Sequence, residues 1–194
     1  MKVKKRGKRL FFNRALRVLL ITNALILIAA AMLGPIYALF VEEIGGDLLD
    51  ASLTGGIFAL TAGIVTLISG KYADRVKQNE LIIVFGYALI GIGFLLYTIV
   101  DSIWFLFAVQ IVIGAGEAIY SPAFDAVYTK HVSVKKAGRE WGSWEAMNYF
   151  TYALGAGIGG LIAFKLGFNS LFVTMAILSF LSAIYIYFLP RDVL

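Results

Sequence analysis

The 194-residue sequence contains no cysteine, one histidine and three prolines. Without cysteine the chain forms no disulfide bond and offers no thiolate to a metal ion, which excludes a disulfide-stapled domain and a cysteine-rich zinc site. Charged residues make up 15% of the chain, whereas soluble domains carry roughly 25%. These shortages argue against a soluble domain and leave a membrane protein as the class that fits the composition.

Hydrophobic residues, by contrast, make up 60% of the chain and occur in long runs. A helix needs about 20 mostly apolar residues to cross the hydrocarbon core of a bilayer. Six segments meet this standard, at residues 18–41, 51–70, 80–99, 103–124, 142–164 and 168–189. The sequence therefore predicts an all-α membrane protein with six transmembrane helices.

Three regions follow from this reading: a basic arm over 1–17, a transmembrane domain over 18–189 and a short tail over 190–194. Eight of the 17 lysines and arginines precede Leu19. If the N-terminus is cytoplasmic, Lys165 is the one basic residue on the outer side. Lysine and arginine accumulate in cytoplasmic loops, so we predict that both termini are cytoplasmic. The basic arm is then a topology signal rather than a nucleic-acid-binding segment, and the protein is expected in a prokaryotic plasma (inner) membrane.

A charged segment with the sequence GKYADRVKQNELI lies between the second and third predicted helices, at 70–82. It resembles the signature of the loop between helices 2 and 3 of the major facilitator superfamily. The matching residues are Gly70, Ala73, Asp74, Arg75 and Ile82. Residues 114–144 resemble the helix 4–5 region of the same superfamily, in which a proline precedes an acidic residue and a basic loop follows.

The resemblance implies an ion pair between Asp125 and Arg75, with Arg139 nearby. Together with Gly70 and Asp74, these residues are expected to form a cytoplasmic latch. Glycine permits close approach of helices, and an arginine is best satisfied by a carboxylate.

The resemblance covers residues 18–189, which correspond to one six-helix half of a typical twelve-helix member. It implies a bundle built from a 3+3 inverted repeat. The prolines in GPIY (34–37) and YSPAF (120–124), each in the last third of its predicted helix, are a weak sign of such a repeat. A single bundle cannot enclose a cavity against lipid. We therefore expect a parallel homodimer whose two-fold axis runs along the membrane normal.

Polar residues inside the predicted helices are the candidates for function. Glu117 and Glu145 lie within apolar segments, where a charged side chain is costly and usually faces a cavity or a partner. Helical spacing places further polar or aromatic residues on the same faces of three helices. The substrate or coupling candidates are Glu117, Glu145, Gln110, Asn148, Tyr152, Asn23, Tyr37 and Tyr120. Either glutamate is expected to bind a cation or to take up a proton.

These features predict a secondary active transporter that moves a small solute by alternating access, with protons as the candidate coupling ion. Two alternatives stay open: an isolated N-terminal half that needs a separate second half, and a non-transporting membrane scaffold. An enzyme is not expected, because no metal-ligand set, nucleophile–base pair or phosphate-binding loop is apparent. No cofactor is expected, and the identity of the substrate is not predicted.

Overall fold

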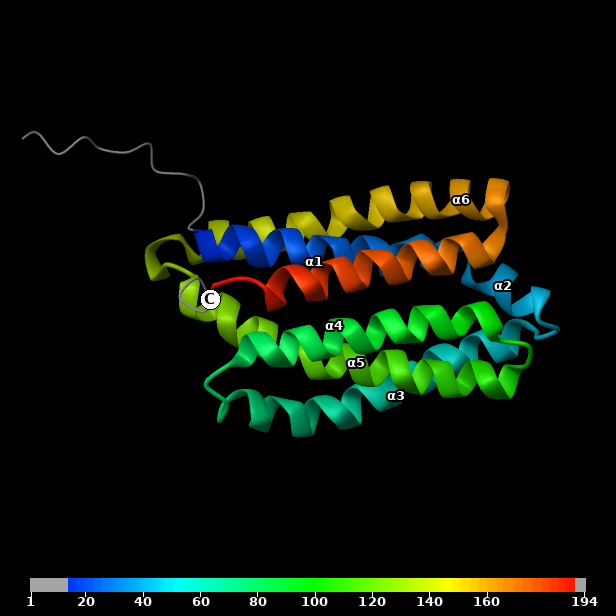
Figure 1. Cartoon of the computed structure of the whole chain (residues 1–194), viewed down its shortest axis with the longest axis horizontal. Coiled ribbons are helices and arrows are strands. Elements are labelled where there is room, and N and C mark those ends of the chain that lie inside the picture. Colours follow the sequence, from blue (N-terminus) through cyan, green and yellow to red (C-terminus); the bar gives the residue numbers. More distant parts are fainter. Residues whose placement is uncertain (1–13, 191–194) are drawn as a thin grey trace, which may run out of the picture.

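The computed structural model describes residues 14–190 as a bundle of helices that run along one common axis (Figure 1). The basic arm before Arg14 and the tail after Pro190 lie outside the described residues. Over the described range the chain contains helices and no strand, so the all-α prediction is confirmed. The helices are α1 (Arg14–Leu33), η1 (Gly34–Ile36), α2 (Tyr37–Glu43), α3 (Leu48–Ala73), α4 (Asn79–Leu96), η2 (Tyr97–Ile99), α5 (Ile103–His131), η3 (Val134–Lys136) and α6 (Ala137–Tyr187).

Five helical segments within residues 14–190 are long and apolar enough to cross a membrane. The last of them, Val134–Tyr187, has 54 residues, far more than the about 20 that one crossing needs. Its chain reverses at Gly167, where φ is 80° and ψ is 171°. Glycine adopts this conformation readily because it has no Cβ. Figure 1 shows the chain doubling back there, so α6 consists of two arms, 137–166 and 168–187.

The first predicted helix, 18–41, is interrupted in the structure. α1 ends at Leu33, a single 3-10 turn follows, and α2 begins at Tyr37. Pro35 accounts for the interruption, since proline lacks a backbone N–H and its ring clashes with the carbonyl four residues earlier. Pro122, by contrast, lies inside α5 without ending it. The two prolines therefore have different local consequences, although both lie toward the ends of predicted membrane helices.

The second predicted helix, 51–70, extends by three residues at each end in the structure, where α3 spans Leu48–Ala73. Its first turn is fixed by a reciprocal capping box. The Asp47 Oδ1 atom accepts a hydrogen bond from the Asp50 backbone N–H at 2.9 Å, and Asp50 Oδ2 accepts one from the Asp47 N–H at 3.0 Å. Such a pair satisfies two N–H groups that have no partner within the helix.

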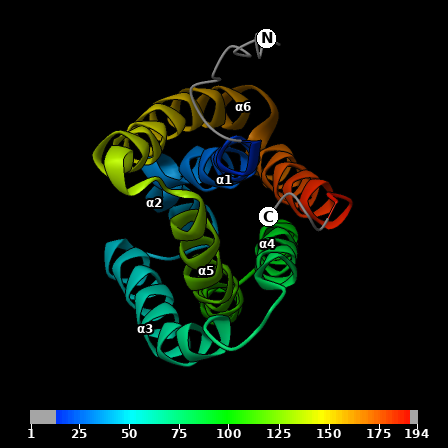
Figure 2. The same ribbon diagram turned by 90° about the vertical axis from the view of Figure 1, so that its left-hand side faces the viewer.

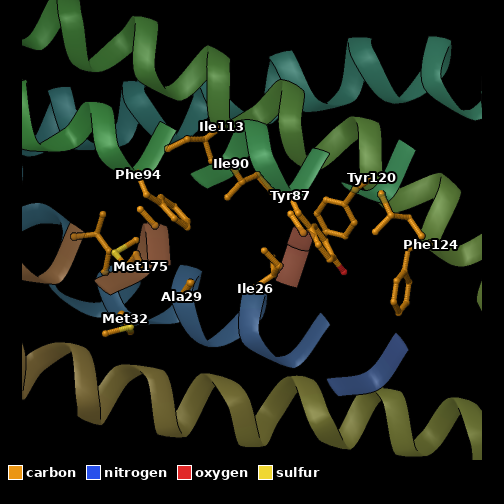
Figure 3. Close-up of a cluster of buried hydrophobic side chains, with 14 of the residues drawn as sticks. Ile26, Ala29, Met32, Tyr87, Ile90, Phe94, Ile113, Tyr120, Phe124 and Met175 are labelled. Atoms are coloured by element: carbon orange, nitrogen blue, oxygen red, sulfur yellow. The ribbon is translucent and has the colours of Figure 1, made fainter. Parts of the chain in front are cut away.

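The hydrophobic core lies where α1, α4, α5 and the second arm of α6 meet. Figure 3 shows a cluster that draws side chains from all four helices, including Ile26, Ala29, Met32, Tyr87, Ile90, Phe94, Ile113, Tyr120, Phe124 and Met175. Small residues permit the close approach of these helices. A Cβ on Gly86 of α4 would lie 2.8 Å from the Gly116 carbonyl oxygen of α5.

α3 is much less buried than the other long helices. Its buried residues are Thr54, Ser69 and Ala73. It is tied to α5 by a hydrogen bond from the Ser69 hydroxyl to the Ala118 carbonyl oxygen. Figure 2, which views the bundle along its axis, shows α3 at the periphery, with α5 between it and α1. Most of the apolar surface of α3 therefore has no partner in this bundle.

Candidate functional site

Two cavities lie along the inner face of α1 and α5. The first, called here the glutamate cavity, has a volume of about 470 Å³ and is lined by α1, η1, α5 and the first arm of α6. The second, called the tyrosine cavity, has a volume of about 360 Å³ and includes Tyr37 and Tyr97. Ala30, Gly34 and Glu117 line both. Glu117 therefore stands at the border between the two cavities.

The glutamate cavity brings together most of the residues that the sequence singled out. Its lining includes the predicted candidates Asn23, Glu117, Tyr120, Asn148 and Tyr152. They come from three helices because each helix turns one polar or aromatic face toward the same space. Asp125, which was predicted as a latch residue, also lines this cavity.

The carboxylate of Glu117 is held on α5 without a fixed partner. Among residues 14–190 no hydrogen bond or ion pair engages its oxygen atoms. The side chain is half-buried. A carboxylate in this position is available to a solute or a proton, because no neighbouring cation neutralises it.

The charged residues that line the glutamate cavity are all acidic. It contains the carboxylates of Glu117 and Asp125 and no lysine, arginine or histidine. The tyrosine cavity has Glu117 and likewise no basic residue. Aromatic rings of Phe124, Trp144 and other residues complete the wall of the glutamate cavity. The cavity thus combines negative charge with aromatic faces, the two features that attract an organic cation.

Two polar atoms in the wall of the glutamate cavity lack a hydrogen-bond partner among the described residues. They are the Trp144 indole Nε1 and the Asn148 Oδ1, one helical turn apart on α6. Leaving a buried donor or acceptor unsatisfied costs about 1–3 kcal/mol. A polar solute or water that binds these atoms would remove this cost.

The tyrosine cavity is organised by Gln110. Its Nε2 atom donates hydrogen bonds to the hydroxyl of Tyr37 at 2.6 Å and to the hydroxyl of Tyr97 at 3.0 Å. Beyond this cavity, the hydroxyl of Tyr87 donates a hydrogen bond to Asn23 Oδ1 at 3.2 Å. Sequence reasoning did not identify Tyr87 and Tyr97 as partners. Both are tyrosines within apolar helices, and this feature could have identified them. The hydroxyl of a buried tyrosine usually needs a hydrogen-bond partner.

Glu145 lies apart from the other candidates. It is exposed on the first arm of α6 and lines neither cavity. The cavity face of this arm passes through Trp144, Asn148 and Thr151, and the next residue along a helix points about 100° away. Glu145 therefore faces the outside of the bundle.

The predicted latch residues lie at the end of the bundle where α1 begins. Asp74 and Arg75 follow the last turn of α3 and are exposed, as is Asp125 on α5. The structure contains no ion pair between Arg75 and Asp125. A Cβ on Gly70 would meet no other part of the bundle within 4 Å, so the close approach expected at this glycine does not occur within one bundle.

Arg139 instead lies beside Glu140, with its Nη2 atom 4.0 Å from Glu140 Oε1. The Glu140 side chain is buried, and its Oε2 accepts a hydrogen bond from the Ser133 backbone N–H at 2.7 Å. The backbone carbonyl oxygen of Glu140 accepts another from the Tyr128 hydroxyl at 2.6 Å. Sequence reasoning missed Glu140, although a carboxylate in the first turn of a helix is typical of a stabilised helix start.

Comparisons with known proteins identify the family that the chain resembles. The family model described as Major Facilitator Superfamily matches residues 19–193. The chain is 26% identical over 177 residues to the multidrug resistance protein MdtG of Proteus mirabilis, covering 89% of this chain and 44% of that protein. It is 27% identical over 173 residues to MdtG of Salmonella typhimurium, covering 86% of this chain and 42% of that protein. The chain thus spans less than half the length of these relatives.

Proposed function

Because this chain belongs to the Major Facilitator Superfamily, we propose that it is a secondary active transporter that moves a small solute by alternating access. It is an integral, multi-pass membrane protein of the bacterial inner membrane. The observation that carries the proposal is the glutamate cavity. It places an unpaired carboxylate, polar side chains and aromatic rings between membrane-spanning helices, where an ionisable side chain is costly and usually serves a function.

Glu117 is the proposed coupling residue. It lines both cavities and has no fixed cation beside it. A proton and a cationic solute would therefore compete for the same carboxylate, which is the simplest way to couple their movements. Glu145 is a second candidate for coupling. It would act from the outer surface of the first arm of α6, where a second bundle would cover it.

The chemistry of the cavity favours a cationic organic solute. Two carboxylates and no basic residue line it, so an anion would meet repulsion and a cation attraction. The rings of Tyr120, Phe124, Trp144 and Tyr152 provide faces for a cation–π contact or for stacking. The name of the relatives, multidrug resistance protein, is compatible with an organic solute.

Uptake into proteoliposomes under an imposed pH gradient tests this function, with radiolabelled tetraphenylphosphonium as the cationic probe. We expect uptake by the unaltered protein, loss of its pH dependence in Glu117→Gln, and normal uptake in Glu42→Gln, whose exposed carboxylate lies on α2 outside both cavities. Glu145→Gln is measured alongside. Unchanged pH dependence in both the Glu117 and the Glu145 variants would exclude coupling through these glutamates.

Six crossings with both termini in the cytoplasm are the proposed topology. The reversal at Gly167 supports two crossings in α6, and Figure 1 shows α1 beginning at the same end of the bundle at which α6 ends. The chain lacks cysteine, so a single introduced cysteine is a unique reporter. A membrane-impermeant maleimide should label Lys165→Cys in intact cells and label Lys135→Cys only after permeabilisation; the reverse pattern would refute the orientation.

A second six-helix bundle is proposed to complete the transport path, and we infer that it is another copy of this chain in parallel orientation. The support is the unmatched surface of α3 and of the first arm of α6. Gly56 and Gly63 of α3 and Gly157 of α6 are exposed, and a Cβ on any of them would meet nothing within 4 Å. Glycine-lined faces of this kind are typical of helix–helix interfaces in membranes. The latch residues Asp74 and Arg75 would then lie near the second bundle.

The alternative partner is a separate second half of a longer transporter. The length of the relatives favours it, because this chain covers 44% of the Proteus mirabilis protein. The mass of the purified protein in nanodiscs distinguishes the two arrangements. A dimer that transports supports the homodimer, whereas a monomer that transports only after another six-helix chain is added supports the second half.

A further inference from the structure

An apolar groove lies at the opposite side of α3 from its open glycines. It has a volume of about 780 Å³ and is formed by the end of α3, the loop that follows it, the start of α4 and one residue of α5. Its apolar wall includes Val65, Ile68, Leu81, Ile82, Phe85 and Ile119. This region, called here the α3–α4 groove, shares no lining residue with the glutamate or tyrosine cavity.

The groove begins at a charged loop and continues into the apolar part of the bundle. On α3 its wall runs from Val65 to Tyr72, a distance of about 10 Å at 1.5 Å per residue. Ile68 and Phe85, one from each side, are 64% and 58% exposed. An apolar groove of this length, with polar residues at one end, is suited to hold hydrocarbon beside a polar group.

One charged residue lines the groove. Five charged residues lie between positions 71 and 80, and Lys77 is the one that lines the groove. Gln78 beside it adds an amide. A basic residue that lines an apolar groove, in a loop proposed to be cytoplasmic, matches the negative head and apolar tail of a phospholipid.

A second bundle is a poorer match for this surface. Successive residues of a helix are about 100° apart, so Gly63 lies between about 140° and 180° around α3 from Ile68 and Tyr72. The face proposed to meet a second bundle therefore points away from the groove. The groove is left facing lipid.

We propose that the α3–α4 groove binds an anionic phospholipid of the cytoplasmic leaflet, with an acyl chain along Ile68 and Phe85 and the phosphate at Lys77. The site rests on the cytoplasmic orientation of the α3–α4 loop proposed above. It requires neither a particular solute nor proton coupling. Nothing in the transport path is needed for the lipid to bind.

Native mass spectrometry of the purified full chain tests the site, with phosphatidylglycerol and phosphatidylcholine titrated separately. We expect tighter retention of phosphatidylglycerol. Lys77→Gln should weaken phosphatidylglycerol binding about fivefold, since one basic residue near an anionic surface contributes about that factor. Lys71→Gln removes the same charge from the adjoining last turn of α3 but outside the groove, and it should change binding less than twofold.

A second variant tests the apolar wall. Ile68→Trp adds bulk at an exposed position of the groove and should weaken retention of both lipids while the melting temperature is kept. Equal affinity for the two lipids, or equal effects of the two lysine variants, would overturn the site. So would an Ile68→Trp variant that changes the oligomeric state and leaves lipid binding intact. Maleimide labelling of Lys77→Cys separates a failure of orientation from a failure of the groove.

Discussion

Two groups of glycines in this chain have opposite surroundings. Inside the bundle, a Cβ on Gly155 of α6 would lie 2.7 Å from the Ile28 carbonyl oxygen, and one on Gly86 of α4 would lie 2.6 Å from the Tyr120 Cβ. On the outside, a Cβ on Gly63 of α3 or on Gly157 of α6 would meet nothing within 4 Å. The first group is therefore explained by packing within the chain. The second group is not, which fits the partner surface proposed above.

The two groups differ in what a larger side chain would cost. At Gly86 and Gly155 the neighbours include backbone carbonyl oxygens of the facing helix, which cannot move without shifting the whole helix. Overpacking of this kind typically costs about 1–3 kcal/mol. At the open positions alanine costs nothing sterically and is the better helix former by about 1 kcal/mol. Substitution of individual glycines therefore separates the packing of one bundle from contacts made beyond it.

The largest effect is expected at Gly159, where an added Cβ would overlap the backbone of Met32 in α1. Gly159→Leu should prevent α1 from packing against the first arm of α6, and we expect little monodisperse protein from size-exclusion chromatography. The neighbouring Gly160→Leu is the matched control, because a Cβ at Gly160 meets nothing within 4 Å. A Gly159→Leu variant as stable as Gly160→Leu would show that α1 and α6 do not pack as described.

A smaller effect is expected at Gly86, which lies against Gly116 and Tyr120 of α5. Gly86→Ala should lower stability by about 1–3 kcal/mol, equivalent to a melting temperature about 2–12 °C lower for a chain of this size. Gly157→Ala should leave the melting temperature unchanged or slightly raised. Equal melting temperatures for the two variants, measured by thermal unfolding in detergent, would remove the distinction between enclosed and open glycines.

Most of the helices could be predicted from the sequence because the bilayer restricts the choice. Backbone polar groups in hydrocarbon must be satisfied within a helix or a closed barrel, so long apolar runs predict helices. The exact ends of the helices depend on local interactions that hydropathy does not measure. The capping box of Asp47 and Asp50 starts α3 three residues before its apolar run, and Pro35 interrupts a run that hydropathy reads as continuous.

The sequence predicted those residues of the candidate site that can be recognised from a single helix. Glu117 and Asn148 were chosen as polar residues within apolar helices, and the structure brings both to the glutamate cavity. Glu145 met the same criterion, but the packing of Gly155 and Gly159 against α1 sets the rotation of that arm and turns Glu145 outward. Rotation about a helix axis depends on its neighbours, which hydropathy and spacing do not specify.

An effect on association is expected at Gly63, in the middle of the open face of α3. Gly63→Trp should leave the melting temperature of the monomer unchanged, because a Cβ there meets nothing within 4 Å. It should weaken self-association roughly tenfold, since a clash of about 1.4 kcal/mol corresponds to that factor. Light scattering in detergent over a range of concentrations measures this. Unaltered protein that remains monomeric throughout would favour the separate second half over the homodimer.

The smallest effect on stability is expected at Gly70, the first residue of the GKYADRV segment. A Cβ at Gly70 would meet nothing within 4 Å, so Gly70→Ala should change the free energy of unfolding by no more than about 0.5 kcal/mol, as is usual for surface positions. If the latch operates against a second bundle, the same substitution should nevertheless reduce transport, because a methyl group would then enter a closed interface. Lys71→Ala, an exposed neighbour in the same segment, controls for loss of local order. Normal stability with normal transport in Gly70→Ala would place this glycine outside any interface and confine the unmatched surface to the middle of α3.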